Sequence, residues 1–423
     1  MNSLQQLAFD PADAKAALVQ LPQRPAVFAL FGAEAHAEPY VGRTPNLRGR
    51  LERLLLPSPK HPRRLQLAGR VRRIEWKLTG SDFESLLLQF DLLQNVYGPK
   101  GLERMHLGSP YFLRFLGSNP YPRITVTNRP SQREADWAYG PFPSRAAAER
   151  FSDEALKLFL LRRCTDDLNP DPSHPGCVYS EMKMCLAPCY KGCSDERYAE
   201  EANGVERFLA TRGESRLVTL RAQREEASAN LQFESAAAIH GQVQKVEAVR
   251  ALAPELVRPM SRLRAVIVQA STEPDEVAVF LFDGGRLRGP AAFSTVGMRI
   301  QNEQSGSSSL FAQPMSVEAV PEEEREQGTG NREQSTANRK AARTVLEARM
   351  DAVLGKLAER TEAPSATVRQ GHLALLKRWY YRPEAKRTGE VFFLDPEGRW
   401  PVKAILRGVG RIAAKSLTAA PAP

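Results

Sequence analysis

The first hundred residues alternate between short apolar runs and segments with a helical spacing of leucines. Residues 26–31 and 40–42 predict two strands, and residues 70–78 alternate apolar and polar side chains like a third. Leucines recur every three to four positions in the segment between the second and third strands, and again after the third. The pattern therefore predicts a small α+β domain over residues 20–105.

The pattern divides the rest of the chain into further parts, so the expected fold class is α+β with several domains. We expect a connecting α/β segment (106–163), a cysteine cluster (164–195), a helical region with a hairpin (196–252) and a C-terminal α/β remnant of undefined fold (262–300 and 342–412). Residues 301–341 are rich in Gln, Glu, Ser and Gly, a composition that predicts a disordered insertion.

Basic residues are concentrated in one early stretch. The chain of 423 residues carries a formal charge of +10, and ten of its Lys and Arg residues fall between Arg43 and Arg73 beside a single acid, Glu52. Such a density favours a polyphosphate partner over a merely solvated surface, because like charges repel unless a polyanion relieves them. The stretch predicts DNA binding, with six candidate contacts: Arg43, Arg48, Arg50, Arg53, Arg63 and Arg64.

No stretch of eighteen apolar residues occurs, so we expect no membrane-spanning segment. The first thirty residues also lack an apolar core followed by a cleavage site, which favours a cytoplasmic protein.

A possible phosphodiester-handling site lies inside the basic stretch. The run Tyr40-Val-Gly-Arg43 sets an aromatic hydroxyl ten positions ahead of Arg50, across a predicted strand-to-helix turn. This run resembles the second half of the GIY-YIG nuclease motif. The resemblance implies catalytic roles for Tyr40 and Arg50, and it makes Arg43 the basic residue that follows the second triplet.

Two positions depart from that nuclease pattern. Phe28 stands where the first triplet would supply a tyrosine, and Gln89 stands where the family has its metal-binding glutamate. A neutral amide is a poor ligand for Mg²⁺, which is usually held by at least one carboxylate, so we expect bound Mg²⁺ only if the site is active. Phe28 alternatively reads as a core aromatic and Gln89 as an ordinary polar helix residue. The pattern predicts weak or lost cleavage, unless another carboxylate substitutes.

All five cysteines lie in one segment, which is typical of metal ligands rather than disulfides in a reducing compartment. Cys164, Cys177, Cys185 and Cys189 follow the spacing Cys-x₁₂-Cys-x₇-Cys-x₃-Cys. Four thiolates suit either zinc or an iron–sulfur cluster, and His174 or Cys193 is a possible further zinc ligand.

The sequence around these cysteines resembles the middle of the UvrC family of excinucleases, which acts in bacterial nucleotide excision repair. The matching runs are Tyr139-Gly-Pro-Phe-Pro-Ser144, Leu161-Arg-Arg-Cys164 and Met184-Cys-Leu-Ala-Pro-Cys189. The resemblance implies that the four cysteines bind a [4Fe–4S] cluster, with zinc as the alternative.

Residues 231–243 resemble the UVR motif, a helical hairpin that docks on the repair helicase UvrB. Their apolar positions predict a tightly packed hairpin core with Phe233 as an anchor; the expected core residues are Leu231, Phe233, Ala236, Ala237, Ile239 and Val243. We expect partner contacts at Leu231, Phe233, Glu234 and Ala237. The alternative is a hairpin that packs only on itself.

Three functional hypotheses follow from the sequence. The favoured one is a short repair protein that binds DNA and the helicase UvrB, with a degenerate incision site. The alternatives are an active metal-dependent endonuclease and a non-enzymatic nucleic-acid adaptor. The resemblance covers roughly residues 20–300, and no acidic set like that of an RNase H-like domain is recognised after it.

Overall fold

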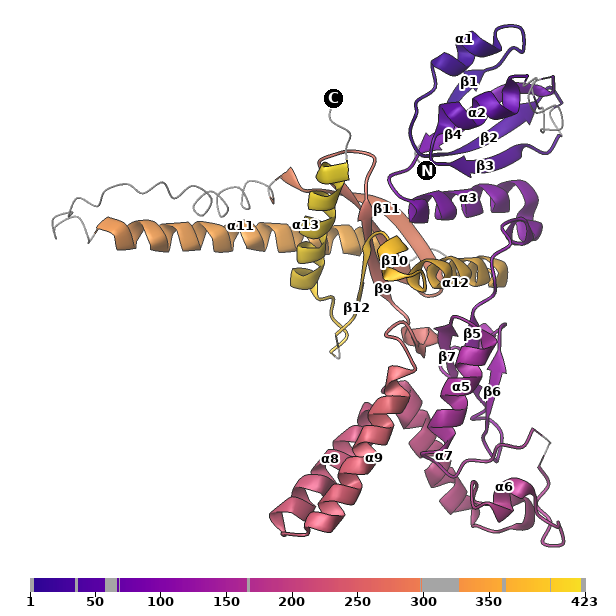
Figure 1. The fold of residues 1–423 in the computed structure, drawn as a ribbon, viewed down its shortest axis with the longest axis vertical. Helices are drawn as coiled ribbons and strands as arrows, with labels where there is room; N and C mark the ends of the chain where they lie inside the picture. The colour runs from indigo at the N-terminus through magenta and orange to yellow at the C-terminus, as the bar shows by residue number, and fades with distance from the viewer. Residues whose placement is uncertain are drawn as a thin grey trace. The chain divides into compact units, whose positions relative to one another are not determined.

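The computed structural model describes residues 4–34, 37–57, 67, 69–165, 168–296, 298, 327–359, 363–395 and 397–419. Within these residues the protein is a mixed α+β structure with three four-stranded antiparallel sheets (Figure 1). The predicted α+β class is confirmed. The chain divides into two compact units, one comprising residues 1–106, 264–362 and 384–423, and the other residues 107–263 and 363–383.

The N-terminal part of the first unit is built on a sheet of order β1-β4-β2-β3. Its strands are β1 (Gln5–Ala8), β2 (Ala26–Gly32), β3 (Tyr40–Thr44) and β4 (Val71–Leu78), and its helices are α1 (Ala14–Val19), α2 (Leu47–Leu55), α3 (Asp82–Tyr97) and α4 (Gly101–Arg104). Helix α2 packs against β2, and α3 packs against β2 and β3. Residues 26–30 of the central strand are therefore all buried.

Local capping explains where the two longer helices of this part begin. The Asn46 side chain accepts a hydrogen bond from the Gly49 N–H at 2.9 Å, and the Ser81 hydroxyl accepts one from the Glu84 N–H at 3.1 Å. The Glu84 carboxylate accepts from the Gly80 N–H rather than from the cap residue itself. Both starts agree with the sequence pattern, whereas β1, α1 and α4 were not predicted.

The C-terminal part of the first unit contains a second sheet, of order β11-β10-β9-β12. Its elements are β9 (Ala265–Ala270), β10 (Glu276–Asp283), β11 (Arg286–Ser294), α11 (Gln327–Ala358), β12 (Glu390–Phe393) and α13 (Val402–Ala419). Helix α11 packs on β10 and β11, and α13 packs on β9. Helix α11 begins at Gln327, inside the stretch expected to be disordered, while residues 301–326 lie outside the described residues.

The second unit surrounds a sheet of order β6-β5-β7-β8. Its strands are β5 (Tyr111–Phe115), β6 (Ile124–Thr127), β7 (Ala138–Phe142) and β8 (Arg258–Pro259), and its helices are α5 (Arg145–Leu156), α6 (Val178–Glu181), α7 (Asp195–Ala210), α8 (Glu214–Ala229), α9 (Phe233–Ala251) and α12 (Ala366–Tyr380). One apolar core joins β5 and β7 to α5, α7, α8 and α9.

Helix α12 is distant in sequence from the rest of its unit but is firmly attached to it. The Tyr381 hydroxyl donates a hydrogen bond to the Pro141 carbonyl at 2.8 Å, and the Lys377 ammonium donates to the Ser109 carbonyl at 3.2 Å. The Trp379 side chain is completely buried.

None of the helices in the described part of the chain is long and apolar enough to cross a membrane.

Candidate functional site

The hairpin of β2 and β3 places the nuclease-like residues. Phe28 is paired with Gly42 in the antiparallel register and is completely buried. A Cβ atom at position 42 would lie only 2.8 Å from Cζ of the Phe28 ring, so glycine is needed there. Phe28 is thus a core aromatic, as the simpler interpretation of the sequence held.

The structure brings Tyr40 and Arg50 together. One Arg50 Nη donates a hydrogen bond to the Tyr40 hydroxyl at 3.3 Å, because the chain turns directly from β3 into α2. The Tyr40 and Phe28 ring centroids are 6.1 Å apart. A phenol and a guanidinium at this distance can together hold one phosphate oxygen.

The other predicted DNA-contacting arginines have varied surroundings. Arg43 forms an ion pair with Asp82 at the start of α3. Arg48 donates to the Leu21 carbonyl at 2.7 Å, and Arg53 donates to the Gly49 carbonyl at 2.9 Å. Both bonds use Nε, so the terminal guanidinium nitrogens of these two arginines do not take part in them. Arg63 and Arg64 lie outside the described residues.

Tyr40 opens onto a cleft of about 550 Å³ in the first unit. Gln89 of α3 lines the same cleft, and Glu103 is the one carboxylate among its described lining residues. The full lining is Tyr40, Val41, Gln89, Leu93, Tyr97, Lys100, Glu103, Arg104 and His106. Asp91 lines a separate cavity together with Glu84.

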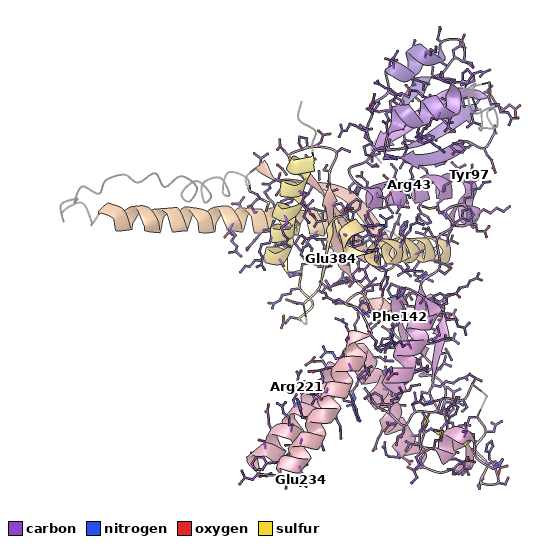
Figure 2. The ribbon with its side chains drawn as sticks, viewed as in Figure 1. Arg43, Tyr97, Phe142, Arg221, Glu234 and Glu384 are labelled. Atoms are coloured by element: carbon purple, nitrogen blue, oxygen red, sulfur yellow. The ribbon has the colours of Figure 1, made fainter. Side chains whose placement is uncertain are left out.

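A set of polar contacts holds one lip of the cleft. The Tyr97 hydroxyl donates to the Pro39 carbonyl at 2.7 Å, and burial raises the pKa of this phenol. The Arg104 guanidinium lies 3.7 Å from the Tyr97 ring centroid and pairs with Glu38 at 3.0 Å. Figure 2 labels Tyr97 and Arg43 in this part of the chain. Helix α4 is thereby tied to the segment before β3.

Sequence reasoning missed the cleft residues that follow α3. The missed residues follow a Gly98-Pro99 turn and are Lys100, Glu103 and His106. This Gly-Pro pair was the one available signal that the chain turns there. No local periodicity indicates that this turn faces Tyr40, so the contact could not be predicted.

The cysteine segment in the second unit gathers its thiols. Burial raises the pKa of both Cys185 and Cys189, and the neighbouring sulfurs of Cys164 and Cys177 raise it further. The backbone N–H groups of Ala187 and Tyr190 donate to the Cys185 and Cys189 sulfurs and oppose this effect. Such N–H groups stabilise thiolates.

The surroundings of the cysteine sulfurs matter for metal binding. Within the described residues, no three His, Cys, Asp or Glu side chains are placed to hold a metal ion. One Arg162 Nη, on a side chain only 1% exposed, donates to the Cys164 sulfur at 3.5 Å. The cysteine sulfurs are soft ligands, and they accept hydrogen bonds from Arg162 and from backbone N–H groups. Both properties suit a thiolate-ligated centre.

Helices α8 and α9 form the predicted hairpin, but its apolar face is only partly covered. Val243 is buried between the helices, whereas Leu231 is 72% exposed and Phe233 66% exposed. The expectation that these two residues pack in the hairpin core is wrong. Glu234 and Ala237 are also exposed, so all four predicted partner contacts face solvent near the α8–α9 turn. Figure 2 marks Glu234 at the far end of the hairpin.

Comparison with known proteins identifies the class of the middle region. Residues 111–208 match the family described as "UvrC/Cho excinuclease, middle domain". The matched range contains β5, β6, β7, α5 and the whole cysteine segment. The middle region of this α+β protein is therefore similar to the middle domain of that family.

Curated relatives extend this result. The chain is 30% identical over 241 residues to UvrABC system protein C of Aliivibrio salmonicida, covering 57% of this chain and 39% of the relative. It is 31% identical over 279 residues to the same protein of Ectopseudomonas mendocina, covering 64% and 42%. The chain spans about two fifths of the length of these relatives. No solved structure matches it. The chain is related to the UvrC family, as its sequence motifs predicted.

Proposed function

We propose that this protein acts in nucleotide excision repair, binding DNA and the helicase UvrB, and that its cleft cuts DNA weakly or not at all. The observation that carries the proposal is the relation to UvrABC system protein C, centred on the middle domain. The basic residues around Tyr40 and the exposed apolar tip of the α8–α9 hairpin supply surfaces of the required kinds.

The chemistry of the cleft supports weak cleavage. Metal-assisted hydrolysis of a phosphodiester needs a group that positions water, a cation for the phosphate oxygens and a carboxylate for the metal. Tyr40 can position the water and Arg50 can supply the cation, and the hydrogen bond between them holds the two side chains together. Gln89 offers only a neutral carbonyl oxygen where the metal needs charge.

A nicking assay tests this proposal. The protein is incubated with damaged duplex DNA, UvrB and Mg²⁺ or Mn²⁺, and we expect few or no nicks. The variant Gln89→Glu should raise nicking. Asn95→Asp is the matched control, because it adds the same charge to α3 in a different cavity. Efficient nicking by the unchanged protein, or equal gains in both variants, would contradict the assignment of Gln89.

A second candidate function is an active endonuclease, and the position of Glu103 favours it. This exposed carboxylate lines the same cleft as Tyr40 and Gln89 and can supply the missing negative charge. In that case the unchanged protein nicks DNA, and Glu103→Gln abolishes the activity. Glu52→Gln, on α2, should leave it intact. Nicking that survives in Glu103→Gln would remove this candidate.

We further infer that Cys164, Cys177, Cys185 and Cys189 hold a [4Fe–4S] cluster. Four thiolates can hold either a cluster or a single zinc ion, and the resemblance of this segment to the middle of the UvrC family favours the cluster. When bound, the cluster would supply a redox-active group. The cysteines themselves would cross-link a segment that contains only short helices.

The hairpin tip is the proposed docking site for UvrB. Leu231 and Phe233 expose large apolar side chains, and such residues become binding hot spots when a partner covers them. The two helices are held together independently of the tip, since Arg221 of α8 pairs with Glu247 of α9 at 3.0 Å.

A further inference from the structure

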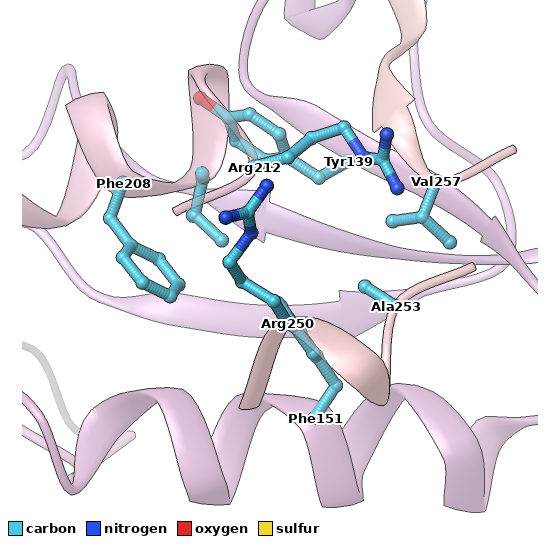
Figure 3. A pocket seen from close by; sticks show the side chains of 8 residues that line it. Tyr139, Phe151, Phe208, Arg212, Arg250, Ala253 and Val257 are labelled. Carbon is cyan, nitrogen blue, oxygen red and sulfur yellow. The ribbon is translucent and has the colours of Figure 1, made fainter. Parts of the chain in front are cut away.

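The second unit contains a small pocket lined by two arginines and a largely apolar wall. The pocket has a volume of about 30 Å³, and Tyr139, Phe151, Phe208 and Val257 form much of its wall. Arg212, from the turn between α7 and α8, and Arg250, near the end of α9, complete it. Figure 3 shows both arginine side chains at this pocket, with the Arg212 guanidinium beside Val257 and the Arg250 guanidinium farther from Val257. We call this the Arg212–Arg250 pocket.

Among the residues that the structure describes, the half-buried Arg212 guanidinium has no ion-pair partner. No hydrogen bond or ion pair from its side chain is found in the described residues, and its Nε is both buried and unsatisfied. Burial lowers the pKa of Arg212, Glu255 opposes this effect, and Arg250 adds to it. Glu255 already pairs with Arg258 at 3.1 Å, so it is not a dedicated partner for Arg212.

The backbone holds Arg212 in a conformation that arginine does not favour. Its φ is 53°, and that of Gly213 is 84°, so two successive residues lie in the left-handed region. This costs a non-glycine residue roughly 1 kcal/mol or more. Glycine would fit position 212 without strain, and the arginine side chain gains no polar contact within the described residues in return. Strain at an unpartnered polar residue is typical of functional positions.

The same turn also positions the second arginine. A Cβ atom on Gly213 would lie 2.8 Å from Cγ of Arg250, so only glycine allows the Arg250 stem to pass this close. Arg250 pairs with Glu214 at 3.0 Å, and Glu214 also faces Arg221 at 3.6 Å. The two guanidiniums thus share a space in which positive charge exceeds the negative charge available to them.

We propose that the Arg212–Arg250 pocket binds a phosphate group. Arginine forks match phosphate oxygens, and an anion in the pocket would relieve the repulsion between the two guanidiniums. The small volume admits phosphate oxygens while the rest of the ligand stays outside. The phosphate belongs either to a nucleic-acid strand or to a free phosphate ion. These residues are distinct from those of the nuclease-like cleft and the hairpin tip, so the proposal stands apart from incision and from the partner helicase.

The variant Arg212→Gly tests the proposal, because it removes the guanidinium and relieves the backbone strain at once. We expect its urea unfolding midpoint to equal or exceed that of the unchanged protein. Its affinity for a short single-stranded oligonucleotide should fall roughly tenfold at low salt, and the slope of log affinity against log salt should shrink by about 0.7, one phosphate contact. Arg250→Gln, which keeps the turn, should also weaken binding.

Two further arms make the result decisive. Arg145→Gln is the charge control, because Arg145 is an exposed residue of α5 paired with Glu149. Titration with inorganic phosphate, followed by calorimetry, distinguishes the two sources of the ligand. Loss of oligonucleotide binding in Arg212→Gly assigns the pocket to a nucleic-acid strand, and loss of phosphate binding alone assigns it to the free ion. Unchanged binding of both ligands, or equal losses in Arg145→Gln, would overturn the proposal.

Discussion

Truncation of Phe233 to alanine would test the docking role of the hairpin most directly. The side chain is 66% exposed in the free protein. A buried aromatic removes about 200 Å² from water, so a partner that covers the exposed two thirds would bury roughly 130 Å² more. At about 25 cal/mol per Å², this amounts to about 3 kcal/mol. Because alanine keeps its Cβ, we expect a loss of about 2–3 kcal/mol, or a roughly 30- to 150-fold weaker Kd.

The assay is a titration of the protein with UvrB, followed by calorimetry. The free energy of unfolding in urea should change by less than about 0.5 kcal/mol, because most of the Phe233 side chain is exposed in the free protein. Val218→Ala is the matched control, since Val218 is 59% exposed on α8, away from the tip. A folded Phe233→Ala protein that binds within twofold of the original would refute the reasoning, and so would an equal loss in the control.

Three other changes have expected outcomes that follow from single contacts. Gly42→Ala should lower the free energy of unfolding in urea by about 1–3 kcal/mol, because the added Cβ would meet the buried Phe28 ring. Adding Phe28→Leu to this variant should recover part of the loss. An unchanged free energy of unfolding in Gly42→Ala would contradict the packing. Arg411 donates two hydrogen bonds to Glu390 and lowers the pKa of that carboxyl, so the pair stabilises the fold above the ordinary carboxyl pKa, and this contribution is lost as pH falls through the lowered pKa. Arg411→Gln should therefore destabilise the protein at about pH 7 but hardly at about pH 3, and equal losses at both would refute the pairing. Cys185→Ser should abolish a visible absorption band and bound iron, whereas one zinc and no iron per unchanged chain would exclude the cluster.

Local features of the nuclease-like site could be predicted from the sequence. Tyr40 and Arg50 are ten residues apart, and a strand followed by a capped helix is enough to bring them together. The pairing of β1 with β4 joins residues about seventy positions apart, so no local pattern signals it. The approach of Glu103 to Tyr40 likewise depends on where α3 ends and how the next turn folds back.

The hairpin illustrates a second limit of sequence patterns. A period of 3.6 residues correctly predicts helices, but it does not tell whether an apolar face is covered. The pattern placed Leu231 and Phe233 in the hairpin core, yet Leu231 lies in the turn, Phe233 is the first residue of α9, and both side chains are exposed. Leu231 also has a φ of 56°, which removes it from either helix.

The late position of α12 in the chain has a consequence for how the second unit matures on the ribosome. Synthesis proceeds from the N-terminus, so residues 107–263 emerge first and wait for about a hundred further residues before α12 arrives. During that interval the Pro141 and Ser109 carbonyls lack the donors that Tyr381 and Lys377 later bring. Fragments that stop near residue 263 should consequently aggregate more readily than chains that extend past residue 383.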